Sequence, residues 1–156
     1  MVAVYFVFLR TDIVKESATV AQNRMIRLPD SSYVTLNAGT EISFDRLSFQ
    51  KKRIVKLRGE AYFQVRKGSE FSVETERGRV RVLGTTFNVY CRGDIMNVSC
   101  LVGKVGVTFA QSVKEYLLTS GMQVSNEGQQ VRSLTFDIEE YKSWREGYFY
   151  YDNAPL

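Results

Sequence analysis

A period-two alternation of apolar and polar residues dominates the centre of the chain. One phase of the alternation contains Val55, Leu57, Gly59, Ala61, Phe63 and Val65. The other phase contains Lys56, Arg58, Glu60, Tyr62, Gln64 and Arg66. A β-strand with one face on a core and the other in water gives this pattern. The sequence therefore predicts a long, half-buried strand here.

The alternation continues but changes phase twice. Residues 71–75 repeat it, Glu76-Arg77-Gly78 offers a turn, and residues 80 and 82 are apolar; residues 85, 87 and 89 are then in the opposite phase. An inserted residue near Leu83-Gly84 explains the first change, because a β-bulge or a sharp strand bend accommodates glycine there. The second change falls at Gly103-Lys104, where a tight turn or bulge is expected.

Other short strands are predicted around residues 25–28, 34–36, 42–44, 116–118 and 122–124, with turn residues between them. The fold class is therefore all-β, with short antiparallel strands in a twisted solenoid-like or sandwich arrangement. The segment 137–146 is the exception. Its Asp137 is a good helix N-cap, acidic residues follow in the first turn and Gly147 is a stop signal. We expect a short helix near the C-terminus.

Four segments in this order resemble the FecR family of transmembrane anti-sigma regulators. They are LPDSSYVTLN, RIVKLRGEAYFQV, VLGTTFNV and LVGKVGV, and the resemblance covers roughly residues 25–134. Two positions depart from the family pattern. Ser31 stands where the family usually has glycine in its LPDGS turn, and Gln64 stands where an acidic residue is common.

The resemblance implies both a role and a division of the chain. Residues 1–24 are a membrane-proximal stub and linker, residues 25–135 a FecR-like β domain, and residues 136–156 a linker helix with the first strand of a truncated C-terminal domain. The implied role is that of a periplasmic sensor in an inner-membrane regulator. Its partners are the signalling domain of a TonB-dependent outer-membrane receptor and, through a cytoplasmic domain that this chain lacks, a sigma factor. The resemblance also favours the solenoid-like form.

The segment 1–10 is strongly apolar but about half as long as a membrane-spanning helix. It is compatible with an edge strand, a truncated signal or the outer end of a transmembrane helix, and the resemblance favours the last. A cleavable signal peptide is the weakest interpretation, because no basic region and no small-residue cleavage site is present. Residues 11–24 are polar and are expected to form a linker.

Composition limits the function classes. The 156 residues suffice for one domain, and 44% hydrophobic with 24% charged residues is ordinary for a soluble globular protein. The net charge of +4 is mild. Much of it comes from a cluster that is read as a solvated sheet face, namely Lys51, Lys52, Arg53, Lys56, Arg58, Arg66 and Lys67. No nucleic-acid-binding motif accompanies this charge, so no nucleic-acid partner is expected.

The chain contains no histidine, which excludes Ser-His and Cys-His nucleophiles and the usual zinc ligands. If Gly93-Asp94 is a hairpin turn, Cys91 lies opposite Met96 and Cys100 opposite Phe87, so two buried reduced thiols are expected; a register change would instead permit a disulfide. The carboxylates Glu60, Glu70, Glu74 and Glu76 are read as a solvated surface, and Asp30, Asp45 and Asp94 lack the spacing of a calcium loop. No cofactor and no metal is expected.

Gly84-Thr85 is the one candidate for chemistry. A threonine hydroxyl can attack the preceding carbonyl, so that the peptide C–N bond breaks and an ester forms, which water then cleaves. Some members of the family resembled cleave themselves at such a pair. The simpler interpretation, which we favour, is that Gly84 makes the bulge and Thr85 is an ordinary strand residue.

Two further interaction hypotheses follow from aromatic residues. A carbohydrate- or cell-wall-binding β-domain is the alternative function, with Tyr33, Tyr62 and Tyr148 as its platform. The segment Tyr148–Tyr151 would lack its natural neighbours if the following domain is truncated, so it is expected to pair with an exposed edge or with a second copy of the chain, giving a homo-oligomer.

Overall fold

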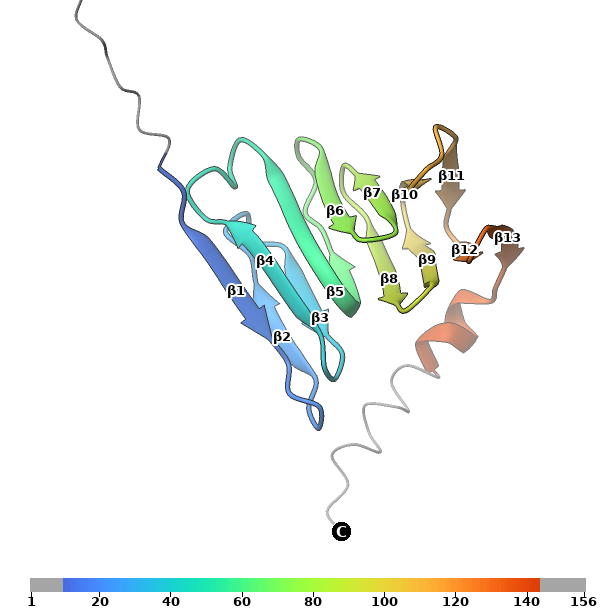
Figure 1. Ribbon diagram of the computed structural model, residues 1–156, viewed down its shortest axis with the longest axis horizontal. Helices are drawn as coiled ribbons and strands as arrows, with labels where there is room; N and C mark the ends of the chain where they lie inside the picture. Colours follow the sequence, from blue (N-terminus) through green and yellow to red (C-terminus); the bar gives the residue numbers. More distant parts are fainter. Residues whose placement is uncertain (1–9, 144–156) are drawn as a thin grey trace, which may run out of the picture.

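The computed structural model describes residues 10–143 of the chain (Figure 1). This part forms a β-structure with one short helix, at residues 138–143, so the predicted fold class is confirmed. The strands are β1 (Ile13–Ser17), β2 (Arg24–Arg27), β3 (Tyr33–Leu36), β4 (Glu41–Asp45), β5 (Arg53–Gln64), β6 (Phe71–Thr75), β7 (Gly78–Val82), β8 (Thr86–Arg92), β9 (Ile95–Val102), β10 (Lys104–Phe109), β11 (Glu115–Thr119), β12 (Met122–Glu127) and β13 (Gln130–Thr135).

The strands form two layers that share β5. Sheet A has the order β1-β4-β5-β6-β7-β10-β11, and sheet B has the order β2-β3-β5-β8-β9-β12-β13. The first half of β5 pairs with β4 and β6, and the second half pairs with β3 and β8. Gly59 lies at the division, with a φ of 116°. The longest strand therefore joins the two layers covalently.

Successive hairpins alternate between the layers. Sheet B contains the hairpins β2–β3, β8–β9 and β12–β13, whereas sheet A contains β6–β7 and β10–β11. The chain crosses from one layer to the other at glycine corners, among them Gly84, Gly103 and Gly121. This arrangement combines features of both forms that the sequence left open, because it is a two-layer structure built by a winding chain.

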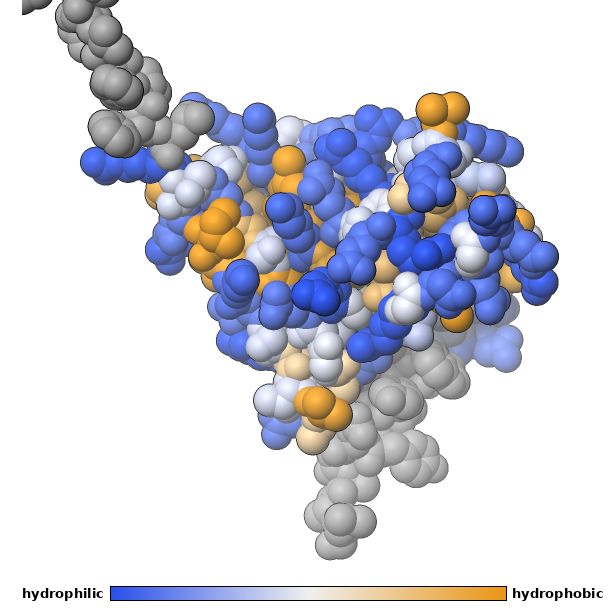
Figure 2. Space-filling model, viewed as in Figure 1, coloured by the Kyte–Doolittle hydropathy of each residue, from blue (hydrophilic) through white to orange (hydrophobic). Residues whose placement is uncertain are grey.

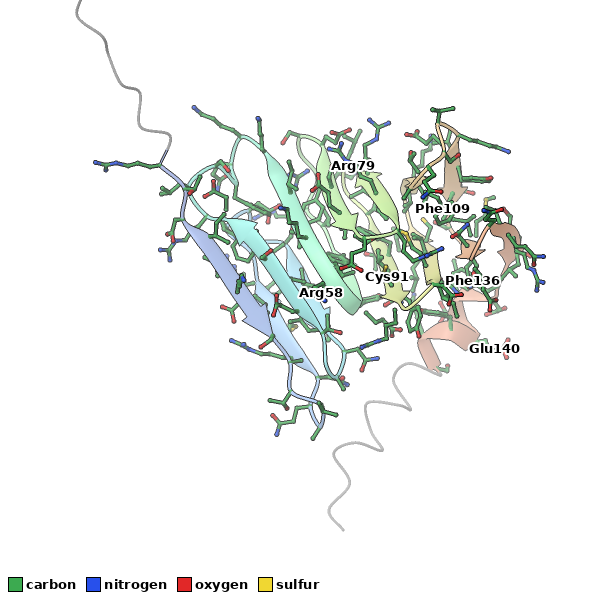
Figure 3. All side chains as sticks on the ribbon, in the orientation of Figure 1. Arg58, Arg79, Cys91, Phe109, Phe136 and Glu140 are labelled. Carbon is green, nitrogen blue, oxygen red and sulfur yellow. The ribbon has the colours of Figure 1, made fainter. Side chains whose placement is uncertain are left out.

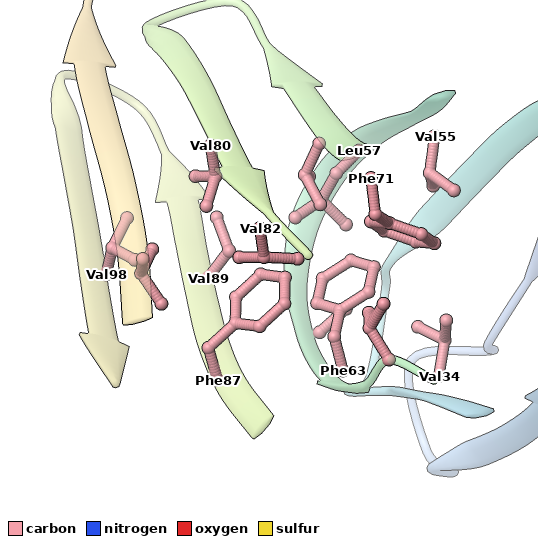
Figure 4. Packing of buried hydrophobic residues seen from close by; sticks show 14 of the residues in the cluster. Val34, Val55, Leu57, Phe63, Phe71, Val80, Val82, Phe87, Val89 and Val98 are labelled. Atoms are coloured by element: carbon pink, nitrogen blue, oxygen red, sulfur yellow. The ribbon is translucent and has the colours of Figure 1, made fainter. Parts of the chain in front are cut away.

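The core lies between the layers. Inward-facing valines, leucines and phenylalanines from both sheets form one buried cluster (Figure 4). A row of phenyl rings runs through it: Phe49 packs edge-on against Phe71 at 6.1 Å, Phe71 against Phe63 at 6.1 Å, and Phe63 stacks on Phe87 at 5.0 Å. Such aromatic pairs contribute about 0.5–1.5 kcal/mol each beyond the burial of their area. The rings thus help to fix the two layers against each other.

Three expectations about strands need correction. The segment 11–24 is more than a linker, because β1 lies in it and pairs with β4 along its whole length. A further strand, β13, follows the turn at Gly128 and had no counterpart in the prediction. The pairing is also not entirely antiparallel, since β5 and β6 run parallel.

The two phase changes were located correctly but explained incompletely. The first, at Leu83-Gly84, separates β7 in sheet A from β8 in sheet B, and the second, at Gly103, separates β9 in sheet B from β10 in sheet A. Both are bends where the chain changes layer, so the inward side of the strand changes with them. A register shift does occur nearby, but it lies between Thr86 and Phe87 of β8.

The short helix begins where the sequence predicts. Asp137 accepts a hydrogen bond at 2.9 Å through its Oδ1 from the backbone N–H of Glu140, which is the geometry of an N-cap. Phe136 packs against Tyr141 with ring centroids 5.2 Å apart. The expected stop at Gly147 lies outside the described residues.

Candidate functional site

A buried ion pair fixes the turn between β2 and β3. Arg53 Nη1 donates to Asp30 Oδ2 at 2.9 Å, and the two side chains are 5% and 8% exposed. Arg53 also donates to the carbonyl oxygens of Arg66, Ser69 and Leu83, and its guanidinium lies 5.5 Å from the centroid of Phe71. The expectation that Arg53 lies on a solvated face is therefore wrong. Arg53 lies on the inward-facing side of β5, and its hydrogen bonds join three separate loops.

Ser31 has a left-handed backbone with a φ of 69°. It lies in the same turn, in which the Leu28 N–H donates to the Ser32 carbonyl at 2.8 Å and Asp30 accepts from the Ser32 N–H at 2.9 Å. Glycine adopts this conformation without a Cβ penalty. The turn thus explains why a glycine suits this position.

A second polar cluster surrounds the division of β5. Thr40 is buried; its hydroxyl donates to the Glu60 carbonyl at 3.0 Å and accepts from the Glu60 N–H at 3.0 Å. A Cβ built on Gly59 would lie 2.5 Å from Thr40 Oγ1, so no side chain fits there. Arg92 donates to the Ala38 carbonyl at 2.7 Å and closes the cluster. The glycine of the LRGEA segment thus has a packing role.

Gly84 and Thr85 form a tightly packed corner. A Cβ on Gly84 would lie 2.7 Å from the Cα of Lys67, so the two backbones are in direct contact. Thr85 is buried, exchanges backbone hydrogen bonds with Val65, and donates through its hydroxyl to the Lys104 carbonyl at 3.0 Å. Gly84 is not among the described residues with positive φ. A structural role accounts for each of these contacts, and cleavage at this bond stays a prediction.

The cysteines lie in the predicted β8–β9 hairpin. Cys91 pairs with Met96 and Cys100 with Phe87, which is the register expected from a turn at Gly93-Asp94. Both thiols are free, Cys100 fully buried and Cys91 half-buried. Figure 3 labels Cys91 on its strand. Burial raises the pKa of the Cys100 thiol to about 11, because the low-dielectric core disfavours the thiolate.

The acidic residues of the central strands do not converge on one site. Glu60 accepts a hydrogen bond from the side-chain amide of Asn37 at 3.1 Å, and Glu70 contacts Arg81 at 3.4 Å. Arg81 also pairs with Glu115. The hydrogen bond from Arg81 to Glu115 is the main reason that the pKa of Arg81 is raised, and the negative charges of Glu115 and Glu70 raise it further. Across residues 10–143, no group of three His, Cys, Asp or Glu side chains is placed to hold a metal ion.

A depression of about 510 Å³ lies on the outer face of sheet A beside the edge strand β11. Gly106 forms part of its floor, since the outer face of β10 has no side chain there, and Leu83 and Leu117 line it while remaining 65% and 71% exposed. The Arg81 ion pairs and the Gly84-Thr85 corner also border it. Exposed apolar side chains, a hollow and the edge strand β11 thus lie together here. A second hollow, of about 520 Å³, lies beside the edge strand β1 next to Ile13, which is 57% exposed.

The outer faces of the two sheets differ in chemistry. On sheet A most outward side chains of β4, β5, β6, β7 and β10 are charged, namely Glu41, Asp45, Lys56, Arg58, Glu74, Arg79, Arg81 and Lys104. Figure 2 shows this face, which is mainly hydrophilic. On sheet B the outward positions of β3, β5, β8, β9 and β12 are Tyr33, Thr35, Glu60, Tyr62, Gln64, Thr86, Asn88, Tyr90, Arg92, Ile95, Asn97, Ser99, Leu101, Gln123, Ser125 and Glu127. Three of them are charged, Glu60, Arg92 and Glu127, and we call this set the tyrosine face.

Comparison with known families places these features in context. The family model described as "FecR protein" matches residues 15–106, which is more than half of the chain. The chain belongs to the FecR family. The match begins inside β1 and ends in β10, so it includes both polar clusters and the Gly84-Thr85 corner.

Two solved structures share the FecR-family fold seen here. Both are crystal structures of a candidate anti-sigma factor from Parabacteroides distasonis ATCC 8503, at 2.50 Å and 1.65 Å resolution. Each is 29% identical to this chain and covers 86% of it, with TM-scores of 0.78 and 0.77. The chain spans 65% of the length of these neighbours. A search of curated proteins gives no match.

The segments that suggested the FecR family have structural roles. LPDSS forms the turn held by Arg53, RGEA contains the division of β5, and LGT forms the corner between β7 and β8. Within residues 10–143, the short helix falls well below the length and apolarity required to span a bilayer.

Proposed function

We propose that this chain is the periplasmic sensor part of an inner-membrane anti-sigma regulator, which relays a signal from a TonB-dependent outer-membrane receptor to an extracytoplasmic-function sigma factor. The FecR match over residues 15–106 carries the proposal, and the likeness to a candidate anti-sigma factor supports it. The lack of converging catalytic groups in the described residues agrees with a regulatory role but does not carry it. The sigma factor itself is bound through a cytoplasmic domain outside this chain.

We further propose that the receptor's signalling domain adds an extended segment to β11. Edge strands present unpaired backbone groups, and proteins usually protect them with lysine, proline or short length. Strand β11 has no lysine, arginine or proline, its one charged residue, Glu115, is paired with Arg81, and its Leu117 is 71% exposed. The Glu115 carboxylate lies over Gly106, so an apolar side chain of the added strand would instead enter the depression beside Leu83 and Leu117, while backbone hydrogen bonds along β11 provide affinity.

The other edges are less suitable for pairing. Strand β1 carries Lys15 and Glu16, and β2 carries Arg24 and Arg27. Strand β13 contains Arg132. Charged side chains on an edge disfavour the addition of another strand. We therefore assign docking to β11 in preference to these three strands.

The binding test compares two exposed apolar positions. Leu117→Lys places a charge on the β11 edge, whereas Val113→Lys places the same charge in the preceding loop, where Val113 is fully exposed. In isothermal titration calorimetry with the purified receptor signalling domain, we expect Leu117→Lys to weaken binding at least tenfold and Val113→Lys to leave it unchanged. Equal affinities for the two variants would place docking elsewhere. Absence of binding by the wild-type chain would remove the receptor proposal itself.

Self-cleavage at Gly84-Thr85 has its own test. We expect the purified protein to remain intact for days on a denaturing gel, because the Thr85 hydroxyl is committed to the Lys104 carbonyl. A fragment that begins at Thr85, and that disappears in Thr85→Ala, would instead establish cleavage. Thr108→Ala is the matched control on the neighbouring strand β10.

A further inference from the structure

Among the described residues, no strand covers the inward side of β13. Val131 and Ser133 lie on this side, because they pair with Asn126 and Val124 of β12, which are both buried. Val131 and Ser133 are nevertheless exposed, as are the other residues of β13. The core between the two layers therefore ends at β12, and β13 extends beyond it.

Sheet A stops short of sheet B at this end of the molecule. Strand β11 is the last strand of sheet A in the described part of the chain, and it lies near β9 and β12 of sheet B. Figure 1 shows β13 as the outermost strand at the end opposite β1. A place for one more strand thus remains beside the free edge of β11 and opposite the inward side of β13. The hairpins alternate between the layers, and this place is where sheet A would continue.

A hollow of about 470 Å³ lies at one end of this place. Phe109 and the loop 110–112, which leads to β11, line it from sheet A, and Val131 lines it from β13. Arg77 Nη2 donates to Asn126 Oδ1 at 2.8 Å, so the turn between β6 and β7 holds the β12–β13 hairpin in position. The gap is therefore already formed, and a segment that enters it does not have to separate the layers.

The two walls of this place favour an extended polypeptide as the occupant. The free edge of β11 presents backbone donors and acceptors, and a segment of about five residues, roughly 17 Å long, matches its length. Side chains on one side of this segment would face Val131, Ser133 and Thr135, none of which is charged. A charge on that side would be buried without a partner, so uncharged residues fit there at alternate positions.

A second copy of the chain does not fit this place through its own β11. If two copies paired β11 with β11 about a two-fold axis, the β12 of the second copy would lie opposite its own β11. That position is the one into which β13 of the first copy extends, so the two strands would overlap. A single extended segment from a different protein does not meet this obstacle.

We propose that β13 covers the receptor segment that pairs with β11, and that its inward side restricts the partner to segments with uncharged residues at alternate positions. This inference rests on the proposed docking of the receptor's signalling domain at β11. It adds a second strand, from the other sheet, that determines which partner is accepted.

The binding test places the same charge on opposite sides of β13. In isothermal titration calorimetry with the purified receptor signalling domain, we expect Ser133→Lys, on the inward side, to weaken binding at least tenfold. Gln130→Lys is the control, because Gln130 pairs with Glu127 on the outward side, and it should leave binding unchanged.

Thiol labelling gives a second measurement that does not depend on an introduced charge. Ser133→Cys and Gln130→Cys are treated with a charged methanethiosulfonate reagent, with and without the receptor domain, and labelling of each cysteine is followed by peptide mass spectrometry. The bound receptor domain should slow labelling of Ser133→Cys at least tenfold. Labelling of Gln130→Cys, and of the native Cys91 on β8, should not change.

The possible failures can be told apart. Weaker binding in Leu117→Lys, with neither weaker binding in Ser133→Lys nor protection of Ser133→Cys, would overturn the inference and leave the receptor proposal standing. Equal losses in Ser133→Lys and Gln130→Lys would also overturn it. Slow labelling of Ser133→Cys in the free chain would assign the place to this chain's own segment after residue 143, which contradicts the inference. Absence of binding by the wild-type chain would remove both proposals.

Discussion

Ser31 shows how a single backbone angle affects stability. Its left-handed φ destabilises the fold by about 1–2 kcal/mol in a residue that has a Cβ. Glycine avoids this cost, but its greater freedom in the unfolded chain destabilises the fold by about 0.5–1 kcal/mol. We predict that Ser31→Gly stabilises the protein by about 0.5–1 kcal/mol, measured by urea denaturation. Ser43→Gly, in the regular strand β4, should destabilise it instead. A loss of stability in both variants would contradict the explanation.

Arg53 and Asp30 illustrate the cost of an unmatched buried charge. Arg53→Met leaves the Asp30 carboxylate buried without its partner, so we predict a loss of about 3–5 kcal/mol in the free energy of unfolding. Arg46→Met is the control. Its ion pair with Asp12 lies at the surface, with side chains 63% and 36% exposed, and such pairs contribute about 0–1 kcal/mol. Similar losses in the two variants would show that burial of the Arg53 pair is unimportant.

Cys100 should make stability depend on pH in the alkaline range. Its pKa is 9.0 in the unfolded chain and about 11 in the fold. Between these values the unfolded thiol ionises while the folded thiol keeps its proton, so the unfolded state binds fewer protons and stability falls as the pH rises. Below pH 9 the thiol contributes no pH dependence.

This prediction is checked by denaturation at pH 8, 9, 10 and 11. We expect the wild type to lose more stability across this window than Cys100→Ala, which has no thiol to ionise. Native protein should also react with a thiol reagent only at Cys91, and the unfolded protein at both cysteines. Parallel pH profiles in the two proteins would reject the assigned cause.

At the scale of elements, β5 depends on glycine where it passes from one sheet to the other. Gly59→Ala would require a φ of 116° in a residue with a Cβ and a contact of 2.5 Å with Thr40, so we predict a loss of about 3–4 kcal/mol. Gly93→Ala is the matched control. It also has a positive φ, 57°, but nothing lies within 4 Å, and the expected loss is about 1 kcal/mol. Thermal melting curves of the two variants would distinguish them, and equal shifts would exclude the packing explanation.

The strands themselves were predictable wherever one face is buried. The alternation from Val55 to Val65 located β5, and the hairpin at Gly93-Asp94 gave the correct register of β8 and β9. A change of phase, however, looks the same in the sequence whether a strand bulges or the chain changes layer. The corners at Gly84 and Gly103 were therefore located but not understood.

Other features required pairing between distant strands. Arg53 occupies the inward phase of β5, and this signal could have identified it as buried; its partner Asp30 could not be deduced, because 23 residues separate them. The diagonal arrangement of Tyr33, Tyr62 and Tyr90 on the adjacent strands β3, β5 and β8 depends on the registers of all three strands at once. Strand β13 was missed because all of its residues are exposed and no alternation marks it.

At the scale of the whole molecule, the remaining question is association. The aromatic segment Tyr148–Tyr151 lies outside the described residues, and its predicted pairing with another copy of the chain stays a prediction. We expect the mass from sedimentation equilibrium to rise with protein concentration, and the double variant Tyr148→Ser, Tyr150→Ser to abolish the rise because it removes apolar contact area. Tyr33→Ser, an exposed tyrosine on the tyrosine face, should behave as the wild type. A monomer at every concentration would reject the prediction.

The sharing of β5 by both layers has a consequence for how the domain opens. Strand β5 has neighbours on both sides in each layer, so neither layer can separate without exposing part of the phenylalanine row. Local opening is then confined to the outermost hairpins, and the interior should exchange its amide hydrogens only through global unfolding. The domain can therefore open its outermost hairpins and pair them with another strand while its core stays folded.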